Sequence, residues 1–63
     1  MEIKIKSVSM KSYCIDLVEC LNDYEVRETW GPQEISVYKF RQLHDAMNAF
    51  ETQYDKFLNT YEN

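Results

Sequence analysis

Few residues in this chain of 63 could perform chemistry. There is one histidine, His44, and there are two cysteines, Cys14 and Cys20. A nucleophilic enzyme needs a thiol or hydroxyl beside a base, together with preorganised donors for the developing oxyanion. The sequence has a single glycine and no phosphate-binding loop. We therefore expect no enzymatic activity and no bound cofactor.

The candidate metal ligands are equally sparse. The two cysteines fall in a segment that we predict to be one strand, where they would lie roughly 20 Å apart, beyond the reach of a disulfide. They are expected to be reduced, and the same distance argues against a metal bound by both. His44, Asn48 and Glu51 are spaced for neighbouring turns of one helical flank. Metal sites normally draw their ligands from several elements, so we predict a solvated flank and no metal.

Glu19 and Glu28 form the remaining candidate pair, because both fall on a sheet face predicted to be apolar. Two carboxylates in one cleft can divide acid and base roles. The pairing derived below makes them diagonal neighbours at the margin of the helix, where both would reach water. We favour this solvated interpretation.

The first pair of strands follows from a turn signal at Asn22-Asp23, which separates two segments rich in β-formers. A two-residue loop would pair Leu21 with Tyr24 and Leu17 with Glu28. Directly opposed residues share a face of the sheet. The apolar face then carries Tyr13, Ile15, Leu17, Leu21, Tyr24, Val26 and Trp30, and the other face carries Cys14, Asp16, Val18, Cys20, Glu25, Arg27 and Thr29.

A second hairpin is predicted at residues 31–34, where Pro32 suits the second position of a turn. Pairing Trp30 with Ile35 places Ile35 and Val37 on the apolar face. Ser36, Tyr38 and Phe40 would then project to the opposite face, near Arg27. At the N-terminus, Ile3 and Ile5 alternate with charged residues, which predicts a half-buried strand.

The last third of the chain carries a helical pattern. Its apolar residues recur at i, i+3, i+4 and i+7, which predicts a helix over about 42–61 with one core-facing stripe: Leu43, Ala46, Met47, Phe50, Tyr54, Phe57, Leu58 and Tyr61. The predicted fold class is α+β, a three- or four-stranded antiparallel β-meander with one long C-terminal α-helix packed on one sheet face. We expect a single domain over 1–63, with strands at about 2–8, 12–21, 24–30 and 34–40.

The charge limits the partners. Eleven acidic residues against seven basic ones give a formal net charge of −4, which disfavours nucleic acids and anionic lipid surfaces. No apolar segment approaches the roughly 20 residues needed to span a bilayer, and the N-terminus lacks the apolar stretch of a signal peptide. We expect a cytoplasmic protein that contacts neither membrane nor nucleic acid.

Protein recognition remains as the function. Glu51, Asp55 and Glu62 line one flank of the predicted helix and could meet a basic partner surface, or act as a mimic of a phosphate backbone. Val18, Arg27 and Tyr38 would mark the uncovered sheet face as a second candidate surface. A self-associating homodimer through that face is the alternative. A small enzyme and a nucleic-acid-binding protein are the further alternatives.

In size and charge, the chain resembles small acidic phage or mobile-element proteins that inhibit a host machine, such as anti-CRISPR proteins and inhibitors of host polymerase or DNA-repair enzymes. This resemblance is one of class and covers no particular residues. It implies a protein of the host cytoplasm that acts by occluding a partner's surface.

Overall fold

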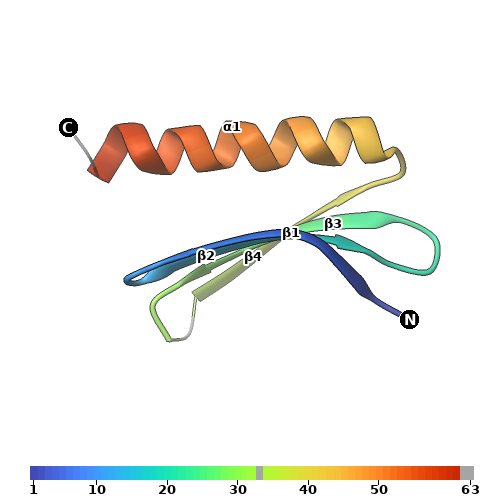
Figure 1. The fold of residues 1–63 in the computed structure, drawn as a ribbon, viewed down its shortest axis with the longest axis horizontal. Coiled ribbons are helices and arrows are strands. Elements are labelled where there is room, and N and C mark those ends of the chain that lie inside the picture. The colour runs from blue at the N-terminus through green and yellow to red at the C-terminus, as the bar shows by residue number, and fades with distance from the viewer. Residues whose placement is uncertain (33, 62–63) are drawn as a thin grey trace.

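A four-stranded antiparallel sheet and one C-terminal helix form two layers (Figure 1). The computed structural model describes residues 1–32 and 34–61. The strands follow one another across the sheet in chain order, and the predicted α+β meander is confirmed. The elements are β1 (Ile3–Met10), β2 (Tyr13–Glu19), β3 (Tyr24–Trp30), β4 (Glu34–Phe40) and α1 (Leu43–Tyr61).

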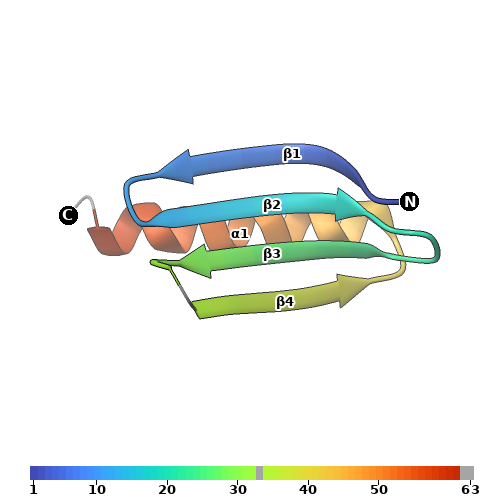
Figure 2. The same cartoon turned by 90° about the horizontal axis from the view of Figure 1, so that it is seen from below.

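The core lies between α1 and the two central strands. Figure 2 shows the helix running along β2 and β3, with β1 and β4 at the two outer edges. Aromatic rings concentrate at one end, where Tyr13 stacks on Phe57 with ring centroids 4.0 Å apart and meets Trp30 edge-on at 4.6 Å. The fully buried apolar residues of this core are Tyr13, Ile15, Leu17, Val26, Ala46 and Phe50.

The first hairpin has the predicted faces but not the predicted pairing. Leu17 lies opposite Val26, and Glu19 opposite Tyr24, a slip of two residues that keeps every side chain on its face. The connection is four residues long and closed by a 2.8 Å bond from the Cys20 amide to the Asp23 carbonyl. A two-residue loop would need positive φ at its centre, which no described residue other than glycine adopts. Leu21 is consequently at the loop tip and 83% exposed, so its predicted place on the apolar face is wrong.

In the second hairpin, the observed pairing differs from the predicted pairing by one residue, and this reverses the two faces of β4. Trp30 pairs with Glu34 rather than with Ile35. Gly31 has a φ of +63°, which permits a shorter connection than the one predicted. A slip of one residue exchanges the two faces of a strand. Phe40 therefore packs against the core, while Ile35 and Val37 lie on the face away from the helix.

Strand β1 contains an irregularity that the alternating pattern did not predict. Its register with β2 shifts between Lys4 and Lys6, so Ile5 is an extra residue of a bulge. Ile3 and Ile5 are both exposed, at 50% and 42%, so the buried face expected at these two residues is not formed. Beyond the bulge, Lys6 turns to the helix side, where its Nζ lies 5.1 Å from the centre of the Phe50 ring.

The helical stripe is buried along only part of its predicted width. Ala46 and Phe50 are fully buried, whereas Leu43 and Met47 are 37% and 42% exposed. Ala49, which the predicted stripe left out, packs against the core instead. The helix is therefore rotated slightly about its axis from the predicted orientation. Within the described residues, no helix has the length and apolar character required to cross a membrane.

Candidate functional site

On the face of the sheet away from α1, the Arg27 guanidinium is held by two carboxylates. Its Nε donates to Oε1 of Glu25 at 2.8 Å, while Nη1 and Nη2 donate to the two oxygens of Glu2 at 3.2 and 2.7 Å. These bonds hold the pKa of the Glu2 carboxyl below its usual value and raise the pKa of Arg27. Arg27 was predicted as a partner contact on this face. The structure places Arg27 on this face, but its guanidinium is already bound to Glu2 and Glu25. Arg27 thereby links the N-terminus to β3.

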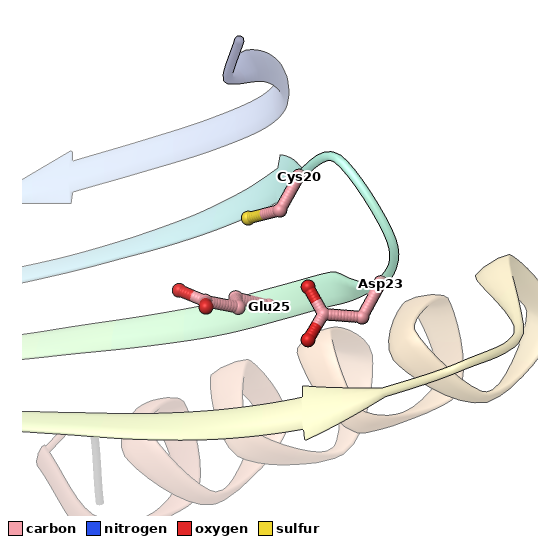
Figure 3. A group of neighbouring side chains, drawn as sticks. All are labelled: Cys20, Asp23 and Glu25. Carbon is pink, nitrogen blue, oxygen red and sulfur yellow. The ribbon is translucent and has the colours of Figure 1, made fainter.

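Beside this network, three potential metal ligands converge from the first hairpin. Figure 3 shows Cys20 at the end of β2, Asp23 at the far end of the loop and Glu25 on β3. One ligand atom from each, the Cys20 Sγ and two carboxylate oxygens, lies within 4.8 Å of the others. The four-residue loop brings them together, because it folds Asp23 back over Cys20. The predicted register already set Cys20 opposite Glu25 on this face, so the sequence could have indicated two of the three members.

The electrostatics of this cluster oppose metal binding. Burial raises the pKa of the Cys20 thiol, and the negative charges of Glu25, Glu2 and Asp23 raise it further. A metal needs the thiolate. The Arg27 Nη2 lies 4.0 Å from the Cys20 sulfur, and Arg27 Nε donates to the Glu25 carboxylate, so two of the three ligands already contact a cation. A thiol and two carboxylates would suit zinc in type, but a metal would have to compete with Arg27 for Cys20 and Glu25.

Two other predicted contact residues on the sheet, Val18 and Tyr38, differ from the prediction, the first in its burial and the second in its face. Val18 lies on the face away from the helix as predicted, but it is only 3% exposed, between Lys4 and Glu25 in the register. Its predicted role as an accessible contact is wrong. Tyr38 lies opposite Val26 and therefore on the helix side, because of the one-residue slip in β4. It cannot stack on Arg27, which projects from the opposite face.

A groove runs between β4 and α1 on the helix side of the sheet. It encloses about 330 Å³, and the buried Glu28 carboxylate lies at its base. Tyr13 donates a 2.7 Å hydrogen bond to Glu28. Glu19 is exposed and lies opposite Tyr24, four residues away along the strand pairing, so the two carboxylates are not the diagonal neighbours predicted. The expectation that both reach water is wrong for Glu28, which is 3% exposed. The groove is lined by Glu28, Trp30, Ser36, Tyr38, Gln53, Lys56, Phe57 and Thr60.

A second hollow lies at the end of the sheet where the β1–β2 and β3–β4 turns meet. The Gly31 amide donates a 2.7 Å bond to the Ser12 carbonyl and joins the two turns. The hollow has a volume of about 410 Å³ and is open to solvent. It is lined by Ser9, Met10, Lys11, Ser12, Tyr13, Cys14, Thr29, Gly31 and Pro32.

The acidic flank of the helix is exposed in the part that the structure describes. Glu51 and Asp55 are exposed one turn apart, and neither forms an ion pair with another described residue. Glu62, the third predicted member, lies outside the described residues. His44 is exposed on the first turn, where its Nε2 is 3.3 Å from the Asn48 amide nitrogen.

The outer edge of β4 differs most from the prediction, because the apolar residues predicted to face the helix lie on the opposite face. Ile35 and Val37 are 64% and 46% exposed on the face away from the helix. No described strand pairs with this edge, and Figure 2 shows it uncovered along its length. A row of unpaired backbone donors and acceptors therefore lies beside two exposed β-branched side chains. A correct prediction of the pairing in the second hairpin would have placed Ile35 and Val37 on this face.

Comparison with protein-family models, with curated proteins and with solved structures finds no match to this chain.

Proposed function

We propose that this chain is a protein-binding module of the cytoplasm, without enzymatic activity, and that it occludes its partner by docking at the outer edge of β4. The observation that carries the proposal is the coincidence of an unpaired strand edge with the exposed Ile35 and Val37. An edge strand binds an extended segment through main-chain hydrogen bonds, and the flanking side chains give specificity.

The placement of the reactive residues supports binding over catalysis. Cys14 projects from the face of the sheet away from α1, and Cys20 follows β2 with its sulfur near Arg27, also on that face. His44 lies on the exposed surface of α1. The sheet separates these thiols from the imidazole, so the thiol–base contact that nucleophilic catalysis requires is not formed among the described residues.

A second candidate surface is the exposed acidic flank of α1. Glu51 and Asp55 lie one turn apart without an ion-pair partner among the described residues. Such a pair favours a partner with a basic surface and makes association dependent on salt. This is the electrostatic form of the same occlusion mechanism.

Affinity capture from a lysate of the source organism with four immobilised chains tests both surfaces. The chains are the wild type, Val37→Lys at the β4 edge, Ile3→Lys at the opposite edge, and the double variant Glu51→Lys/Asp55→Lys. Ile3 is 50% exposed against 46% for Val37, so the two single variants are matched in exposure.

A protein retained by the wild type and Ile3→Lys but lost with Val37→Lys supports the β4 edge. Loss with the helix double variant alone, together with release by salt, supports the acidic flank and overturns the edge. Equal capture by all four chains, or capture by none, overturns the proposed function.

A further inference from the structure

The two edges of the sheet differ in how they are protected against pairing. Bulges and lysines are devices that natural edge strands use to prevent the addition of another strand. Strand β1 has both, since its register shifts between Lys4 and Lys6. Strand β4 carries one exposed lysine, Lys39, but it has neither a bulge nor a proline, and all seven of its residues pair with β3 in unbroken register. The β4 edge is therefore the less protected of the two and the better suited to receive another strand.

We infer that the occupant of this edge is β4 of a second copy of the chain, paired antiparallel about a two-fold axis at Val37. The two four-stranded sheets would join into one continuous sheet of eight strands, with both helices on the same side. This inference rests on the part of the proposed function that makes the β4 edge a docking surface, and it names a second copy of the chain as the occupant.

Symmetry restricts the register. A two-fold axis normal to the sheet keeps the helix side of both copies on one side, so opposed residues must come from the same face. The axis must then lie midway between the two copies of one residue, which pairs with itself. An axis at Val37 pairs the whole strand, whereas an axis at Ser36 or Tyr38 leaves two residues unpaired. The pairs are Glu34 with Phe40, Ile35 with Lys39, Ser36 with Tyr38, and Val37 with itself.

The side chains of β4 are compatible with this register. Neither Glu34 nor Lys39 meets a like charge, and the two Lys39 residues would be roughly 13 Å apart along the strands. On the face away from the helix, the two Val37 side chains meet at the axis with Ile35 of each copy diagonally beside them. Diagonal neighbours lie within contact range of long side chains. The pairing thus covers the two most exposed apolar residues of β4.

The helix side of the sheet is compatible with the same pairing. Tyr38, which is 38% exposed, would lie next to Ser36 of the second copy. Both residues line the groove between β4 and α1. Each tyrosine would therefore cover the mouth of a groove that is open in the single chain.

Disulfide trapping tests the register. In a background of Cys14→Ser and Cys20→Ser, a Val37→Cys variant would place two cysteines directly opposite each other, with Cα atoms about 4.5–5.5 Å apart. This lies within the range that a disulfide accepts. The matched variant Ile35→Cys would place its cysteines roughly 13 Å apart. We expect a covalent dimer from Val37→Cys and none from Ile35→Cys under the same mild oxidation. Equal trapping of both variants, or trapping of neither, overturns the register.

Sedimentation equilibrium over the micromolar range tests the dimer itself. We expect twice the chain mass of 7.6 kDa for the wild type and for Ile3→Lys. Val37→Lys places two like charges in contact at the axis and should return the single-chain mass, with an unchanged circular dichroism spectrum. A wild type that stays monomeric, or a Val37→Lys variant that stays dimeric, overturns the inference.

These outcomes separate the inference from the proposed function. If the wild type is monomeric but Val37→Lys abolishes capture of a protein, the edge binds a foreign segment and only the inference fails. If the wild type is a dimer trapped through Val37→Cys and none of the surface variants changes capture, the inference stands and the proposed function fails.

Discussion

The Tyr13 hydroxyl donates a 2.7 Å hydrogen bond to Oε2 of Glu28, and both side chains are buried between the sheet and the helix. Tyr13 lies on β2 and Glu28 on β3, and Phe57 stacks on the Tyr13 ring. A carboxylate that is 3% exposed is costly to bury without such a donor. The bond therefore allows an acidic residue to occupy the core side of the sheet.

Replacement of this donor should destabilise the fold. We expect Tyr13→Phe to lower the free energy of unfolding by about 1–3 kcal/mol at neutral pH, because the Glu28 carboxylate stays buried without its donor. Urea denaturation followed by circular dichroism measures the change. The matched control is Tyr24→Phe, since Tyr24 packs against the core but its hydroxyl has no hydrogen-bond partner among the described residues. Equal effects of the two variants would contradict the assignment.

The same contact should make stability fall at alkaline pH. Burial and the hydrogen bond to Glu28 raise the pKa of Tyr13 above its ordinary value of 10. Above pH 10, the unfolded chain releases this proton while the folded chain retains it, so stability declines as pH rises toward the folded-state value. Below pH 10, the stabilisation that arises from the raised pKa of Tyr13 is present in full. Denaturation measured at a series of pH values should show a steeper alkaline decline for Tyr24→Phe than for Tyr13→Phe. Parallel curves would exclude Tyr13 as the source.

The Arg27 network should be visible in the titration of Glu2. The hydrogen bonds from Arg27 hold the pKa of the Glu2 carboxyl below its ordinary value of 4.5. We expect Arg27→Met to return that pKa toward 4.5, as measured by NMR of the side-chain carboxyl. A lowered folded-state pKa contributes stability above the ordinary value, and this is lost as pH falls through the folded-state value. The acid limb of the stability curve should therefore be shallower in Arg27→Met.

Lys39→Met is the control for this experiment. It removes a cation from the same face of the sheet, but Lys39 forms no ion pair with a described residue. Glu2 should titrate as in the wild type. An unchanged Glu2 titration in Arg27→Met would show that the contact is not maintained in solution.

The rotation of the helix gives a contrast between two neighbouring apolar residues. Phe50 is 1% exposed and Met47 is 42% exposed. Phe50→Ala should cost about 3–5 kcal/mol, up to complete loss of cooperative unfolding in so small a domain, and Met47→Ala should change stability by about 0.5 kcal/mol or less. Thermal denaturation of both variants measures this. A large loss of stability in Met47→Ala would contradict this orientation of the helix and favour the one predicted from the stripe alone.

The sequence predicts the elements well because their signals are local. Alternation with period two marks β2 and β3, and the i, i+3, i+4, i+7 recurrence marks α1. The face assignment of Tyr13, Ile15, Leu17 and Val26 was also correct despite a pairing error, because a slip of two residues preserves alternation. The candidate surface was less predictable. Val18 is buried and Tyr38 is on the helix side, so Ile35 and Val37 are the exposed apolar residues of the face away from the helix.

By itself, then, the sequence determined the α+β meander, the approximate bounds of its strands and helix, and which side of the first hairpin faces the core. Loop lengths, the bulge in β1 and the one-residue slip of β4 were decided only in the tertiary structure. Local propensity hardly distinguishes registers that differ by a residue. The contacts that do distinguish them, among Tyr13, Trp30 and Phe57 at one end of the sheet and Phe40 against the core, form between segments distant in the chain. Those contacts, by reversing β4, also decided which of its residues are exposed to a partner.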